Sequence, residues 1–359
     1  MRRIAAGIIG VAVVVSLCAL TGVRVGASSP TAQNPRPRRV DGTQAIINAL
    51  GRPAPTVSGL PSWNGSFSFG GSNYPYTMLG TDPSAGSRTT TLRMDLIPLR
   101  LTFDDGGITL DGNDTVSNVM ASPIFQRAAY RSGQAQYADA MQRAEFWNDV
   151  QTRSRGYHVL VAHPKVFPSV PIEVPAGSGF AVDTANGPSG VVTTPFLASL
   201  LPRVSDFYDP GAVLVFLTKD VTGDTFLGFH FVFTPPGKSV AQTLIFSGVF
   251  TPGIVTDAAH SDVYVLSHEV AEWINDPYVS NVVPQWVNPG DGTCFSNLLE
   301  VGDPVEFLPN DSFEVTTGNH LFHVTDVAGV SWFAHDAPSH ELGGAYSYNG
   351  TLNTFSNLC

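Results

Sequence analysis

The chain has 359 residues, of which 43% are hydrophobic and 14% charged, and its formal net charge at pH 7 is −11. This length is sufficient for a buried core in one large domain or two lobes. The acidic balance argues against nucleic acid or an anionic membrane as a partner, because both repel negative charge. We expect neither.

The first 27 residues have the pattern of a secretory signal peptide. Arg2 and Arg3 precede an almost unbroken apolar run over residues 5–20, and small residues up to Ala27 suit cleavage. The apolar run is too short for a typical membrane span. We expect cleavage near Ala27 and a secreted protein, extracellular or at the cell surface. Cleavage removes three arginines and no acid, which changes the charge from −11 to −14.

A polar segment separates the signal from the domain. Residues 28–55 are predicted to form a flexible leader, because their first part is rich in proline and arginine. A short helix is expected within it over residues 44–50. The rest, 56–359, is expected to be one large domain, with possible lobes over 56–250 and 251–359.

Alternating apolar residues indicate several strands along the domain. The predicted strands cover residues 89–103, 157–162, 172–182, 212–217, 226–234 and 240–250. Helices are expected over 134–153, which lacks glycine and proline, and over 194–201, which Pro202 ends. This order predicts an α+β fold with an antiparallel or mixed sheet, the antiparallel form being favoured for residues 212–250.

A further helix is predicted over residues 256–275, which contain no proline or glycine, and Pro277 ends it. Its apolar stripe consists of Val263, Leu266, Val270 and Ile274. His268 and Glu272 are four residues apart and share a face, about 200° around the helix from Leu266. The helix therefore presents a polar pair away from its apolar stripe, and a loop-rich C-terminal part follows it.

The polar pair belongs to the pattern H-E-x-x-E, formed by His268, Glu269 and Glu272. Catalytic zinc needs three protein ligands and an open position for water. Glu300 and Asp303 follow Glu272 by 28 and 31 residues, and either can be the third ligand. Glu269 is the expected catalytic residue, the general base that takes a proton from metal-bound water. The competing interpretation is a solvated helix face on which these residues align by chance.

The motif, with the D-P and E-V-G-D that follow it, resembles a divergent zincin-type metallopeptidase core over residues 266–304. It is also similar to a block of secreted phosphate-induced (exordium-like) and uncharacterised exported bacterial proteins. The resemblance implies a zincin-like helix, a zinc ion and a peptide or protein substrate. It favours Glu300 as third ligand and Asp303 as the partner of the His268 imidazole. Glu272 stands where zincins have histidine, so another divalent ion can replace zinc.

Other polar residues are weaker candidates. His320 and His323 are possible ligands, and His323, His335 or Tyr278 could stabilise an oxyanion. A structural role is expected for each of them. His230, inside a predicted strand, is expected to be a packed or surface residue.

The cysteines left after signal removal, Cys294 and Cys359, are expected to form a disulfide, as is usual in exported proteins. Two functions follow from these patterns. The first is a secreted metal-dependent hydrolase, a zinc metallopeptidase. The second is a secreted non-enzymatic binding or cell-wall-associated protein with a structural or vestigial metal site.

Overall fold

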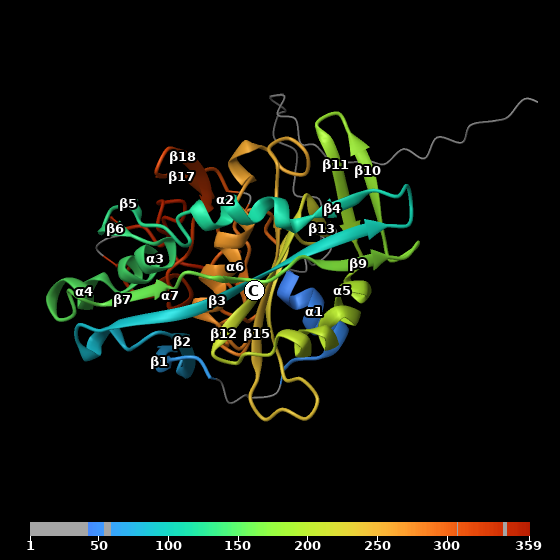
Figure 1. Cartoon of the computed structure of the whole chain (residues 1–359). Helices are drawn as coiled ribbons and strands as arrows, with labels where there is room; N and C mark the ends of the chain where they lie inside the picture. The colour runs from blue at the N-terminus through green and yellow to red at the C-terminus, as the bar shows by residue number, and fades with distance from the viewer. Residues whose placement is uncertain (1–41, 54–58, 307, 340–342) are drawn as a thin grey trace, which may run out of the picture. The chain divides into compact units, whose positions relative to one another are not determined.

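The structure, a computed structural model, describes residues 42–53, 59–306, 308–339 and 343–359. The predicted signal peptide and most of the predicted leader lie outside these ranges. Within the leader, α1 (Gly42–Leu50) includes the short helix expected there. The fold is α+β, as predicted, and a mixed sheet lies at its centre (Figure 1).

The long strand β3 (Thr89–Phe103) has the predicted bounds and organises this sheet. The strand order is β14 (Gly228–Phe233), β15 (Gln242–Val249), β12 (Ala212–Lys219), β3 and β4 (Thr109–Asp111). Three further strands also pair with β3: β7 (His158–Val161), β8 (Lys165–Val166) and β9 (Val170–Val174). β12 pairs parallel with both β3 and β15, whereas β14 pairs antiparallel with β15. The antiparallel prediction for residues 212–250 is therefore wrong for β12, because β15 returns from the edge strand β14 to lie between β14 and β12.

Smaller sheets surround the central one. They are formed by β1 (Ser62–Phe69) with β2 (Ser72–Leu79), β5 (Ala128–Tyr130) with β6 (Gly133–Ala135), β10 (Gly179–Thr184) with β11 (Gly187–Val192) and β13 (Val221–Gly223), β16 (Trp286–Val287) with β19 (Asn357–Leu358), and β17 (Ser312–Thr317) with β18 (His320–Thr325). The single strand predicted over 172–182 is divided between β9 and β10. The break falls at Pro175 and at Gly177, whose φ of 83° ends an extended run.

The helices differ from prediction mainly at their ends. They are α2 (Val116–Ala121), α3 (Tyr137–Glu145), α4 (Trp147–Thr152), α5 (Thr194–Leu200), α6 (Tyr264–Asn275) and α7 (Val330–Ala334), with 3-10 turns η1 (Pro83–Ala85), η2 (Gly112–Thr115), η3 (Leu201–Phe207) and η4 (Ala258–His260). The helix predicted over 134–153 is interrupted at Phe146, which leaves helical geometry. The motif helix starts at Tyr264 rather than near residue 256, because Asp262 has a positive φ of 46°.

Two hydrophobic clusters cover the two faces of the central sheet. On β3, the side chains of Leu92, Met94 and Leu96 belong to the first cluster, and those of Leu99 and Leu101 to the second. The first cluster also contains residues of α3 and α6, whereas the second contains residues of α1, α5 and η3. The first cluster combines residues from both sides of position 250, so the two possible lobes share one core.

The C-terminal part is rich in loops and is tied by a disulfide. Cys294 and Cys359 are bonded, with their Cα atoms 5.7 Å apart, and β16 pairs with β19 beside them. This confirms the predicted cysteine pair. Among the residues that the structure describes, no helix is long and apolar enough to cross a membrane.

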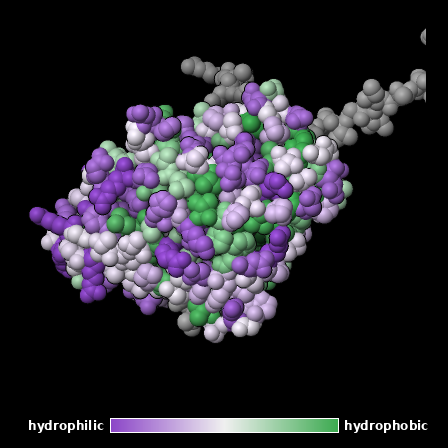
Figure 2. Space-filling view, viewed as in Figure 1, coloured by the Kyte–Doolittle hydropathy of each residue, from purple (hydrophilic) through white to green (hydrophobic). Residues whose placement is uncertain are grey.

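The face shown in Figure 2 carries mainly hydrophilic residues, with hydrophobic ones gathered toward the middle of the view. The large hydrophobic side chains that are clearly exposed in the described chain are Leu50, Val166, Phe180, Val182, Leu321, Phe355 and Leu358. They come from six different elements and loops. Dispersed apolar residues of this kind are ordinary on a protein surface.

Candidate metal centre

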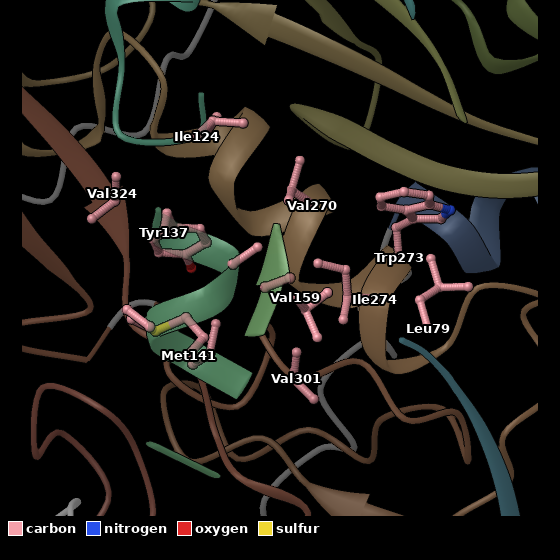
Figure 3. Close-up of a cluster of buried hydrophobic side chains, with 14 of the residues drawn as sticks. Leu79, Ile124, Tyr137, Met141, Val159, Val270, Trp273, Ile274, Val301 and Val324 are labelled. Carbon is pink, nitrogen blue, oxygen red and sulfur yellow. The ribbon is translucent and has the colours of Figure 1, made fainter. Parts of the chain in front are cut away.

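All twelve residues of α6 are buried. The helix packs against β14, β15, β18 and α3, and Figure 1 shows it beside the central sheet. On its apolar side, Val270, Trp273 and Ile274 lie in a cluster with Tyr137 and Met141 of α3 (Figure 3). The expected polar face of the helix is therefore buried in the protein interior and does not line a broad open surface.

The predicted pair on α6 meets a third side chain. His268 Nε2 lies 3.1 Å from Glu272 Oε1 and 3.5 Å from Asp303 Oδ1. All three residues are buried, and one ligand atom from each lies within 4.8 Å of the others. Four-residue spacing on a helix explains the first contact, and the loop after β16 supplies the third residue.

Gly302 shapes this group by having no side chain. A Cβ at this position would lie 2.6 Å from Cε1 and Nδ1 of His268, too close for any side chain. The Gly302 N–H also donates a hydrogen bond to Glu272 Oε1 at 3.2 Å. The bend over residues 300–303 thus contacts the imidazole and orients the carboxylate of the predicted pair.

A second histidine, His230, lies against the same carboxylates. Its Nδ1 is 3.5 Å from Glu272 Oε2 and 3.8 Å from Oε2 of both Glu269 and Glu300. Sequence reasoning placed His230 among packed or surface residues and missed this position. The available signal was the alternation on β14, because Phe229 and Phe231 pack in the second cluster and His230 must face the other way.

The other nitrogen of His230 is held by the turn that follows α6. His230 Nε2 donates to the carbonyl oxygen of Asp276 at 3.1 Å. The carboxylate of Asp276 accepts hydrogen bonds from the backbone N–H groups of Ser280 and Asn281, which fixes the turn. The other ring nitrogen, Nδ1, is the atom that faces the carboxylates; it donates a proton toward them in the charged ring, and only in the neutral ring does it offer a lone pair to a metal.

The two downstream acids contact different histidines. Asp303 joins His268, whereas Glu300 lies beside His230. The zincin resemblance also made Asp303 the partner of the His268 imidazole, but it assigned Glu300 to that same site as ligand, and Glu300 lies beside His230 instead. The reason is local geometry: residues 300–303 form a bend and not a helical turn, so side chains three apart do not share a face.

Burial and mutual charge shift the ionisation of these groups strongly. Burial lowers the pKa of His230, but Glu269 and Glu272 outweigh it and raise that pKa to about 10. Burial also lowers the pKa of His268, but Glu272 and Asp303 outweigh this effect and raise that pKa well above its usual value. Burial raises the pKa of Glu269. The pKa of Glu272 is lowered despite burial, because both imidazoles favour its charged form.

The weaker candidates have other surroundings. His323 Nδ1 pairs with Asp262 at 2.8 Å, and His335 Nε2 pairs with Ser356 at 2.8 Å. His320 is an exposed residue of β18, and Tyr278 packs against the second hydrophobic cluster. The hydrogen bonds of His323 and His335 thus join them to residues other than His268, Glu269 and Glu272.

No protein-family model, curated protein or solved structure matches the chain. The zincin resemblance therefore stays a prediction, and the function has to be inferred from the residues of the site.

Proposed function

We propose that the chain is a secreted metal-dependent hydrolase whose zinc or other divalent ion binds to His268, Glu272 and Asp303. The observation that supports this is the convergence of one imidazole and two carboxylates, all buried, on one point. Buried carboxylates are costly unless they are paired with charge or bound to a metal. Secretion is supported by the N-terminal signal pattern and by the disulfide, which suits an oxidising compartment.

The donor atoms fit a divalent ion. Imidazole and carboxylate are common ligands of zinc, and more carboxylates shift preference toward harder ions such as manganese. Glu269 provides a further sign, since it is 4% exposed and its Oε2 accepts no hydrogen bond from any described residue. A buried carboxylate oxygen without a donor suits a site that holds a cation.

The bound ion would lower the pKa of water and polarise a substrate carbonyl. Glu269 is the residue that would take the proton. It is adjacent to His268 in the motif, and burial raises the pKa of its carboxyl group, which brings that group nearer to neutral pH, where a general base is most effective. The Gly302 N–H donates to Glu272 Oε1 and would keep that carboxylate in position with or without a bound ion.

The first test is metal analysis of purified chain, with Asp303→Asn and His268→Ala as variants. We expect wild-type protein to retain a divalent ion and to lose thermal stability in chelator. The Asp303→Asn variant should bind the ion more weakly. Wild-type protein without metal, and with the same melting temperature in chelator, would disprove the proposal. Hydrolysis is tested separately with a peptide library and Glu269→Gln, which should remove activity.

A second candidate is a non-enzymatic secreted protein in which the ion is structural. It is favoured by burial, because the most exposed of the three ligand residues, His268, is only 8% exposed. In that case Glu269→Gln leaves the measured function of the protein unchanged, although chelator still lowers its stability. The two candidates therefore differ in the response to Glu269→Gln and not in the response to chelator.

A further inference from the structure

The described chain brings a second set of ligand atoms to the centre, on the side of α6 that faces β14. His230, Glu269 and Glu272 each offer one ligand atom, and these atoms lie within 4.8 Å of one another. His230 is fully buried, and Glu269 and Glu272 are 4% and 3% exposed. The two sets share a single residue, Glu272.

The shared residue presents a different oxygen to each histidine. Glu272 Oε1 lies 3.1 Å from His268 Nε2, and Glu272 Oε2 lies 3.5 Å from His230 Nδ1. A carboxylate with one oxygen toward each of two ligand sets has the arrangement of a bridging ligand. In two-metal sites the ions are about 3.5–4 Å apart, a separation that one carboxylate can span.

The separations around His230 suit ligands of a common ion better than hydrogen bonds. Ligand atoms bound at about 2.1 Å in tetrahedral geometry lie about 3.4 Å apart. The distances from His230 Nδ1 to Glu272 and Glu269, 3.5 and 3.8 Å, are close to that value. They are longer than a charge-assisted N–H···O bond of about 2.8 Å.

The charge of the six side chains also favours more than one ion. His230, His268, Glu269, Glu272, Glu300 and Asp303 are all buried. In the neutral form that binds metal, the two imidazoles leave the four carboxylates with a charge of −4, which one divalent ion would reduce to −2 and two ions would neutralise. Two imidazoles with four carboxylates are also the ligands of di-iron and di-manganese centres in helical bundles, a different scaffold.

We infer that the chain binds a second divalent metal ion through His230, Glu269 and Glu300, and that Glu272 bridges this ion to the one at His268 and Asp303. The inference depends on the proposed metal centre and extends it to two ions. His230 donates through Nε2 to Asp276, so Nδ1 would be the ligand atom; Thr43 Oγ1, 3.4 Å from Nδ1, donates instead to the His230 carbonyl oxygen at 3.0 Å. In the two-ion form Glu269 is a ligand, whereas in the single-ion form it is free to accept a proton.

The ratio of metal to protein tests the second site. Full-length mature chain is loaded with excess Zn²⁺ or Mn²⁺, freed of unbound ion and analysed. We expect two ions per wild-type chain and one per chain in His230→Ala, His230→Gln and Glu269→Gln. His268→Ala should lose the other ion. His323→Ala is the matched control, since His323 is a partly buried histidine that pairs with Asp262 and should keep both ions.

Electron paramagnetic resonance of the wild-type chain loaded with Mn²⁺ needs no variant, so it covers the case in which His230 variants fail to fold. Two ions bridged by Glu272 give the spectrum of a magnetically coupled pair. One ion per chain, with the spectrum of isolated Mn²⁺, overturns the second site and leaves the proposed function standing. No bound ion of either kind overturns both. One remaining ion in His230→Ala, together with two in wild type, supports the inference.

Discussion

The two sides of α6 are equally buried but contribute to stability in opposite ways. Val270, Trp273 and Ile274 remove apolar surface from water, which stabilises the fold whether or not an ion is bound. His268, Glu269 and Glu272 bury charge, which costs free energy unless a partner compensates it. The difference teaches that the polar side depends on compensating charge, which the two imidazoles supply and which the proposed ion would also supply, whereas the apolar side is explained by packing alone.

The largest effect is expected on the apolar side. Trp273→Ala should lower the free energy of unfolding by about 3–5 kcal/mol, because it leaves a cavity in a fully buried position. It also removes the hydrogen bond from Trp273 Nε1 to Thr243. The loss, measured by urea denaturation, should be the same with metal and with chelator. A loss seen only with metal would contradict the division between the two sides.

A smaller and conditional effect is expected on the polar side. Glu272→Gln should abolish the stabilisation that added Zn²⁺ gives to wild-type protein, which is about 2.7 kcal/mol at a concentration 100 times the dissociation constant. The physical reason is that Glu272 contacts both histidines. Melting temperatures over a zinc titration measure the effect. Equal zinc stabilisation of variant and wild type would show that Glu272 is no ligand.

In the absence of metal, removing a buried carboxylate of the centre should no longer lower the free energy of unfolding. Glu269→Gln in chelator is expected to leave the protein as stable as wild type, or more stable by about 1 kcal/mol, because it removes one charge from a buried acidic group. The control is Glu314→Gln, since the Glu314 side chain is 65% exposed and should change stability by less than about 0.5 kcal/mol. Clear destabilisation by Glu269→Gln in chelator would mean that the carboxylate is needed for folding.

The smallest effect concerns a histidine outside the centre whose charge is locally compensated. Hydrogen bonding to Asp311 first, and to Asp257, raises the pKa of His260 to about 9 from 6.5. Because the folded-state pKa is the higher one, this stabilisation is complete below about pH 6.5 and is lost as the pH rises through about 9. His260→Gln should therefore cost about 1 kcal/mol at pH 6 and nothing at pH 10, as measured by urea denaturation. An equal cost at both pH values would contradict it.

The sequence was sufficient for features that depend on nearby residues. The alternation over β3 predicted its bounds, and the spacing of His268 and Glu272 predicted their contact, because both follow from the geometry of one strand or one helix. His230 could not be assigned in this way. It lies 38 residues before His268, and only the pairing of β14 with β15 places it against α6. The orientations of Glu300 and Asp303 depend on an irregular bend, for which no periodicity exists.

The bend over residues 300–303 has a consequence for how this chain can vary. Glu300 and Asp303 contact different histidines, Val301 is part of the hydrophobic core, and Gly302 has no room for a Cβ beside His268. All four positions are therefore constrained: Glu300 by His230, Val301 by the core, and both Gly302 and Asp303 by His268. Insertions or deletions should be accepted in the loops before this stretch, between residues 289 and 293, while a one-residue change of length inside it would separate both acids from their histidines.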